Sequence, residues 1–161
     1  MNPRPLRHTL ADALVSGAIA STAAAATAAA RGARDSGSAI APINATSHIV
    51  WGSEAGDVDR IRASYTLPGL ALNAGAGVFW AMLYERVFGE VAERGDAARA
   101  IAGGAAVAAL AYVTDYHLVP KRLTPGWEMR ISRRSLALVF TALALALPVR
   151  GLLRNRMARR R

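Results

Sequence analysis

Four long apolar runs constrain this chain more than any other feature of its sequence. They cover about 10–30, 70–88, 97–119 and 133–147, with few charged residues inside them. A helix needs about 20 apolar residues to cross a bilayer, whereas the strands of a soluble β protein show short alternations of apolar and polar residues. The 161 residues therefore predict one all-α domain, a polytopic membrane helical bundle with four transmembrane helices.

The first run also has features of a secretory signal peptide. Basic residues precede it and three alanines end it, as they would before a cleavage site. The run is longer than the apolar core of a signal peptide, so we favour a retained span.

Local signals indicate how the spans begin and how they pack. Asp96 and Ser132 are suited to cap the N-termini of the third and fourth spans. Small residues recur every four positions in the first and third spans, which allows close helix packing. These residues are Ser16, Ala20, Ala24 and Ala28, and then Ala100, Gly104 and Ala108.

A shorter helix is predicted at 42–51, between the first two spans. Pro42 suits the first turn of a helix and Gly52 the position after its end. Ten residues give about 15 Å, half of a hydrocarbon core, so this helix should be re-entrant or interfacial. A helix that began near Gly37 would be nearly long enough to span, and a fifth span would change the orientation.

Positive charge dominates the ends of the spans. The chain has 19 arginines and one lysine, and its net charge is +9. Because the arginines cluster at span ends and in a basic tail, 150–161, we expect anionic lipid headgroups as partners and no nucleic acid. The candidate headgroup contacts are Arg150, Arg154, Arg156 and Arg159.

Orientation follows from the positive-inside rule. With four spans, the side that holds the termini carries 11 lysines and arginines and the other side carries 9. The difference places both termini in the cytoplasm. The bias toward arginine and alanine is typical of a GC-rich bacterial genome, so we expect the bacterial inner membrane.

Asp115 is the most unfavourable residue in this pattern, because it lies in the last turns of the third span. A carboxylate there usually faces protein or water. Four spans put it on one side of the membrane with Asn44, His48, Asn73 and His117, the candidate ligand-binding residues. We expect Asp115 to pair with His48, Lys121 or Arg122. The opposite side holds Asp12, Glu85, Arg86 and Arg150, so a direct pair between Asp115 and Glu85 or Arg150 is not expected.

Several kinds of site are not expected. The chain has no cysteine and no nucleotide-binding motif, so neither a thiolate metal site nor a cofactor is predicted. Asp115 and His117 are two apart, which directs them to different faces of a helix, and no paired-histidine spacing supports a metal site. Asn44 and Asn73 also fit a simpler interpretation, in which each forms a hydrogen bond between helices.

Three stretches resemble small bacterial inner-membrane proteins to which no activity is assigned. They are APINATSHIVWG (41–52), LALNAGAGVFWAMLYE (70–85) and AYVTDYHLVPKRLTPGWE (111–128), and together they span about half of the chain. The resemblance implies a multi-pass membrane protein with a polar patch on one side, and it implies no mechanism.

Three hypotheses of function remain. In the first, a non-enzymatic membrane protein binds a small polar ligand, an ion or a lipid headgroup at the polar patch, in support of transport by a small homo-oligomer. The second is a structural or accessory subunit that packs in a larger membrane complex. The third is a membrane-embedded enzyme with Asp115 and His48 as an acid–base pair, ranked last because no nucleophile or metal accompanies them.

Overall fold

The computed structural model describes residues 6–160, so Arg4 and Arg161, which entered the comparison of charges, lie outside it. All regular structure in this part of the chain is helical, and four of its helical segments are long and apolar enough to cross a membrane. They are α1 (Leu6–Asp35), α4 (Ala63–Glu93), α5 (Ala97–Val113) with the π turn η2 (Thr114–Leu118), and α6 (Arg133–Ala146) with α7 (Val149–Ala158). The predicted helical bundle with four candidate spans is confirmed to this extent.

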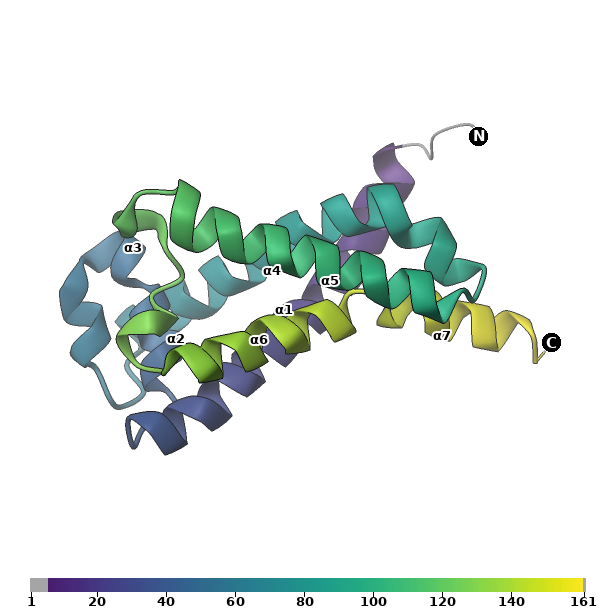
Figure 1. Cartoon of the computed structure of the whole chain (residues 1–161). Helices are drawn as coiled ribbons and strands as arrows, with labels where there is room; N and C mark the ends of the chain where they lie inside the picture. Colours follow the sequence, from purple (N-terminus) through teal and green to yellow (C-terminus); the bar gives the residue numbers. More distant parts are fainter. Residues whose placement is uncertain (1–5, 161) are drawn as a thin grey trace.

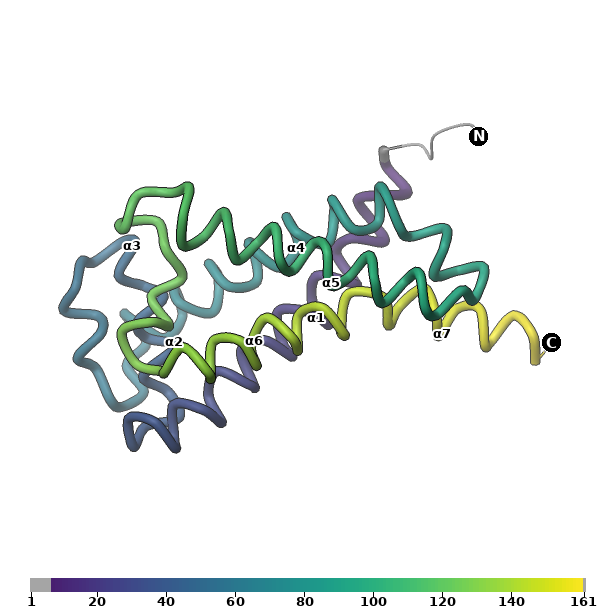
Figure 2. Tube along the Cα trace, in the orientation of Figure 1, coloured from purple at the N-terminus to yellow at the C-terminus, as the bar shows by residue number. Residues whose placement is uncertain are grey.

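The four segments form an elongated bundle in which consecutive segments run in opposite directions (Figure 1). α1 begins and α7 ends at the same end of the bundle, which we call the termini end; it also holds residues 85–99. The opposite end, the loop end, consists of residues 36–62 and 114–132. Figure 2 shows the traces of these two loop segments side by side, and contacts join α2 to η4 and α3 to η3.

α1 and α4 are in close contact where both carry glycine. A Cβ on Gly17 would lie 2.6 Å from the Cα of Val78, and a Cβ on Gly77 would lie 2.6 Å from the Cβ of Ser21. The predicted ridge of small residues is buried in full: Ser16, Ala20, Ala24 and Ala28. The close packing expected of this ridge is therefore achieved inside the chain.

α5 packs against α6 through a second glycine contact. A Cβ on Gly104 would lie 2.1 Å from the carbonyl oxygen of Ala144, so only glycine lets the two backbones come this close. Both predicted caps of these helices form. The Asp96 carboxylate accepts a hydrogen bond from the Arg99 N–H at 3.1 Å. The Ser132 hydroxyl accepts one from the Ser135 N–H at 3.3 Å.

α4 begins before Pro68, whereas the sequence suggested a span from about residue 70. Proline has no N–H, so the carbonyl of Ser64, one turn earlier, receives no hydrogen bond from it. The indole N–H of Trp51 donates to that carbonyl at 2.7 Å. A side chain from the loop thus takes the place of the missing helical bond and allows the helix to extend.

The segment predicted as one helix at 42–51 is two short helices, α2 (Ala41–Thr46) and α3 (His48–Trp51). All six residues of α2 are buried, mainly against α4 and the 3₁₀ turn η1 (Ser53–Asp57). Two further 3₁₀ turns, η3 (Lys121–Leu123) and η4 (Trp127–Met129), complete the loop end. The short segment is therefore packed within the protein.

The fourth span is interrupted at Pro148 and then resumes as α7. Residues 150–158 were expected as a basic tail, but they are helical and contact α4 and α1. Gly151 permits this contact, because a Cβ there would lie 2.6 Å from the Cβ of Ala92.

Candidate functional site

Asn44 holds the loop end together. Its side chain is fully buried in α2, and its amide nitrogen donates to the carbonyls of Val58 at 2.8 Å and Arg60 at 3.0 Å. Its amide oxygen accepts from the Thr66 hydroxyl at 2.7 Å. Because these bonds engage both ends of the amide, Asn44 serves to fix the 58–60 segment against α2 and α4.

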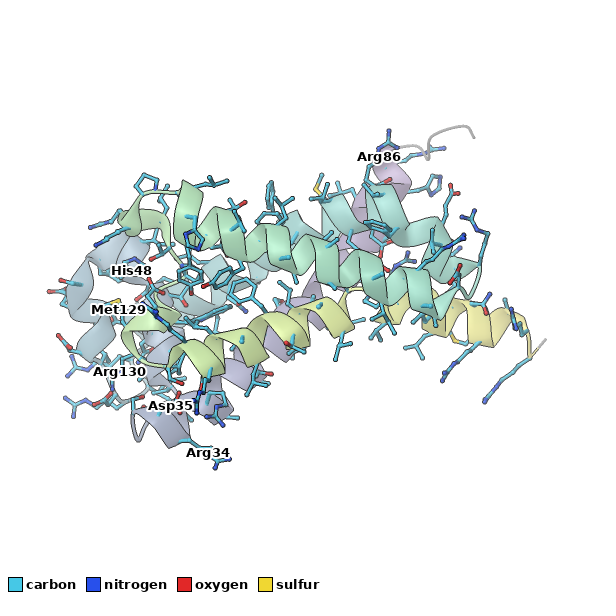
Figure 3. The ribbon with its side chains drawn as sticks, viewed as in Figure 1. Arg34, Asp35, His48, Arg86, Met129 and Arg130 are labelled. Carbon is cyan, nitrogen blue, oxygen red and sulfur yellow. The ribbon has the colours of Figure 1, made fainter. Side chains whose placement is uncertain are left out.

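His48 is also bound by the protein. It lies at the loop end, in Figure 3 far from the labelled Arg86, and only 7% of its surface is exposed. Nδ1 is 3.0 Å from the carbonyl oxygen of Ala45, and Nε2 is 3.3 Å from that of Lys121. The ring thus lies between α2 and the segment that leads to α6, with a backbone carbonyl at each nitrogen.

Asp115 forms none of the three ion pairs expected for it. His48 faces backbone carbonyls, and the guanidinium of Arg122 donates to the carbonyls of Ile49 at 3.1 Å and Val50 at 3.2 Å. Within residues 6–160 no salt bridge or hydrogen bond reaches the Asp115 carboxylate. The expectation was wrong, and for His48 and Arg122 the reason is that backbone carbonyls, not the carboxylate, bind these side chains.

The backbone around Asp115 has an unusual helical conformation. Residues 114–118 form a π turn at the end of α5, and single π turns recur at functional sites in other proteins. The turn leaves Asp115 partly buried, next to a small cavity of about 30 Å³. Asn73 of α4, Ser21 of α1 and Trp127 of η4 line the same cavity. The structure therefore brings together two of the five candidate residues, Asp115 and Asn73.

Some polar groups near this cavity lack a partner. Trp127 is 7% exposed, and its indole N–H is buried without an acceptor. The charged group that acts on Asp115 is another carboxylate, that of Glu128. Glu128 accepts from the Thr124 hydroxyl at 2.5 Å, while the buried Tyr116 hydroxyl approaches it without hydrogen-bond geometry. The site is thus rich in acceptors and carries no cation among the described residues.

His117 lies outside this arrangement. It is exposed, and its ring packs edge-on against Tyr112, with ring centroids 5.7 Å apart. Within residues 6–160, no three histidine or acidic side chains come together as metal ligands would.

A cluster of charges at the termini end was not predicted as a unit. The guanidinium of Arg150 lies 2.8 Å from Asp12, 2.7 Å from Glu85 and 3.0 Å from Glu93, and its side chain is 9% exposed. The Ser16 hydroxyl donates to Glu85 at 2.5 Å and accepts from Arg150 Nε at 3.2 Å. The placement of Asp12, Glu85 and Arg150 on one side of four spans was the signal that could have revealed it.

The other candidate headgroup residues lie further along α7. Arg154 is 63% exposed and reaches Glu93 at 3.3 Å. Arg156 and Arg159 are exposed at the same end. Arg150 differs from these three because its side chain is only 9% exposed and because it also binds the buried carboxylate of Glu85.

Comparison with protein-family models, with curated proteins and with solved structures finds no match for this chain.

Proposed function

We propose that this chain is an integral protein of a bacterial inner membrane with both termini in the cytoplasm. The support is the set of four apolar helical segments and the count of 11 against 9 basic residues on the two sides. In this orientation the loop end faces the periplasm, and Asp115 lies near that surface.

We further propose that the cavity beside Asp115 binds a small monovalent cation together with one water molecule. One observation carries this proposal: a partly buried carboxylate faces a cavity, and its charged neighbour is a second carboxylate instead of a base. A carboxylate in a membrane helix normally has a compensating partner, because an isolated charge is poorly solvated there. A bound cation supplies that partner.

The size of the cavity fits this pair of ligands. A water molecule needs about 10–15 Å³ of such space. A cavity of about 30 Å³ therefore holds about two water-sized particles. This volume excludes a sugar, an amino acid or a nucleotide, so the ligand is an ion or a solute of similar size.

Some polar groups that line the cavity suit the cation, and others suit the water molecule. The amide nitrogen of Asn73 already donates to the Ser21 carbonyl at 3.0 Å, which leaves its amide oxygen to face a cation beside the Asp115 carboxylate. The unpartnered indole N–H of Trp127 suits the oxygen of the water. Oxygen ligands of this kind are typical of sites for hard cations.

We rank the other two hypotheses below this one. An acid–base enzyme requires His48 next to Asp115, but both ring nitrogens of His48 face backbone carbonyls. An accessory subunit requires free ridges of small residues, and those of α1 and α5 are buried within this chain.

The test compares thermal unfolding of the detergent-purified protein in choline chloride with unfolding after lithium, sodium or potassium replaces choline at constant ionic strength. At a cation concentration about 100-fold above its Kd, the free energy of unfolding should rise by about 2.7 kcal/mol, which corresponds to a shift of several degrees. Asp115→Asn should abolish the shift.

Asp57→Asn is the matched control, because Asp57 is an exposed carboxylate of the same end and lies outside the cavity. It should keep the full shift. If no cation stabilises the wild type, or if Asp115→Asn responds as the wild type does, the proposal is wrong.

A further inference from the structure

An apolar groove of about 530 Å³ runs along the outside of the bundle between α5 and α6. This is the size of a typical ligand site. Phe140 forms a wall that the groove shares with the Asp115 cavity, which lies on its inner side. The groove is therefore a second site on the outer surface of the bundle.

Small side chains create the groove. Ala105 and Ala109 of α5 face Ala137 and Ala144 of α6, where larger residues would close the gap between the helices. The backbones of the two helices meet at Gly104 and Ala144, and Tyr112 packs edge-on against Phe140 with ring centroids 5.4 Å apart.

The length and direction of the groove match one leaflet of a bilayer. Its lining on α6 extends from Arg133, at the loop end, to Leu145. Twelve residues of helix rise by about 18 Å, and half of a hydrocarbon core is about 15 Å thick. If α6 crosses the membrane, Arg133 lies at headgroup level and the apolar part of the groove points toward the bilayer centre.

Among residues 6–160, Arg133 is the only charged residue that lines this groove. It is exposed, and within residues 6–160 no hydrogen bond or ion pair engages its guanidinium. Arginine binds phosphate through paired N–H donors, and a free guanidinium at the mouth of an apolar groove is complementary to a phospholipid.

We propose that this groove binds one phospholipid, with an acyl chain along the alanines and the phosphate on Arg133. This site is independent of the cation proposed at Asp115. It differs from the basic residues of α7 because it combines a headgroup contact with a channel for the chain.

The headgroup contact is tested with neighbouring arginines as a matched pair. Binding of dioleoyl phosphatidylglycerol to the delipidated full-length protein is measured by native mass spectrometry across a lipid titration, with dioleoylglycerol as the lipid that lacks phosphate. A hydrogen-bonded charge contributes about 1.5–3 kcal/mol, so Arg133→Gln should weaken phosphatidylglycerol binding about tenfold or more and bring it to the level of dioleoylglycerol.

Arg134→Gln is the control for general electrostatic attraction. Arg134 is also exposed at the start of α6, but it does not line the groove. Binding should be unchanged in this variant. Equal weakening by Arg133→Gln and Arg134→Gln would overturn the proposal, because it would indicate a diffuse attraction to the basic surface.

The acyl-chain contact is tested on α5. Ala109→Phe fills the groove and should abolish lipid binding, whereas Ala106→Phe, at an exposed alanine outside the lining, should preserve it. Both variants are first required to elute as the wild type does and to show its helical circular dichroism; Ala105→Phe replaces Ala109→Phe if that variant misfolds. The proposal would be overturned if Ala109→Phe, which fills the groove, still bound lipid. It would also be overturned if the wild type were a dimer that binds no lipid and if Ala109→Phe converted this dimer to a monomer.

Discussion

Two acidic residues of the apolar segments, Glu85 and Asp115, have opposite surroundings at the two ends of the bundle. Glu85 is 2% exposed, and Arg150 and the Ser16 hydroxyl bind its carboxylate at 2.7 and 2.5 Å. Asp115 is partly exposed and faces a cavity, with the carboxylate of Glu128 as its charged neighbour.

The comparison separates a charge that serves the fold from a charge that is available to a ligand. At the termini end, Arg150 joins carboxylates from α1 and α4 to α7, so the buried charge of Glu85 has a cationic partner within the chain. At the loop end, the basic side chain of Arg122 binds backbone carbonyls and leaves Asp115 without a partner. Both carboxylates are unfavourable in an apolar segment, but only that of Glu85 is compensated by the protein.

The largest effect should come from Arg150→Met. This change leaves the buried carboxylate of Glu85 without the guanidinium that binds it, and removal of one partner from a buried ion pair costs about 3–5 kcal/mol. Equilibrium unfolding in detergent micelles measures the loss. Arg156→Met, at an exposed position of the same helix, should change the free energy of unfolding by less than about 0.5 kcal/mol. Similar losses in the two variants would show that the cluster does not stabilise the fold.

A direct comparison of Glu85→Gln with Asp115→Asn sharpens the contrast. Glu85→Gln weakens hydrogen bonds between charged groups and should lower the free energy of unfolding by about 1.5–3 kcal/mol. Asp115→Asn, measured in choline chloride without small cations, removes no contact of the protein and takes away a charge that the protein does not compensate, so it should not lower the free energy of unfolding. If both variants lose the same stability, Asp115 is a structural residue and the contrast fails.

The periodic features of the sequence predicted the fold well. The apolar runs indicated the four candidate spans, and the caps at Asp96 and Ser132 form as their positions suggested. The ridge of small residues in α1 is buried as expected. These features depend on residues close in sequence, so a pattern of residue types is sufficient to indicate them.

The contacts between distant segments were predicted less well. The extension of α4 through Pro68 depends on an indole N–H that comes from Trp51, and the composition of α4 alone could not indicate it. The charge cluster at Arg150 was assigned to one side of the membrane, but its contacts depend on how α7 turns at Pro148. At the loop end, backbone carbonyls bind His48 and Arg122. Because every residue has a carbonyl, no pattern of residue types in the sequence indicates these contacts.

The smallest effect compares two buried serines of α1, of which Ser16 reaches the charge cluster and Ser21, in the middle of the helix, does not. The Ser16 hydroxyl donates to Glu85 and accepts from Arg150, so Ser16→Ala should lower the free energy of unfolding by about 1–2 kcal/mol. The Ser21 hydroxyl donates at 3.3 Å to the Ala18 carbonyl of its own helix, so Ser21→Ala should change it by less than about 0.5 kcal/mol. Both substitutions replace serine by alanine at a helical position that is at most 5% exposed. The effects of helix propensity and of lost side-chain volume on stability are therefore nearly the same in the two variants. The difference in unfolding free energy between the two variants, measured in the same detergent, therefore reports the contribution of the charge cluster. A larger loss for Ser21→Ala would show that the Ser16 contacts with the cluster do not stabilise the fold.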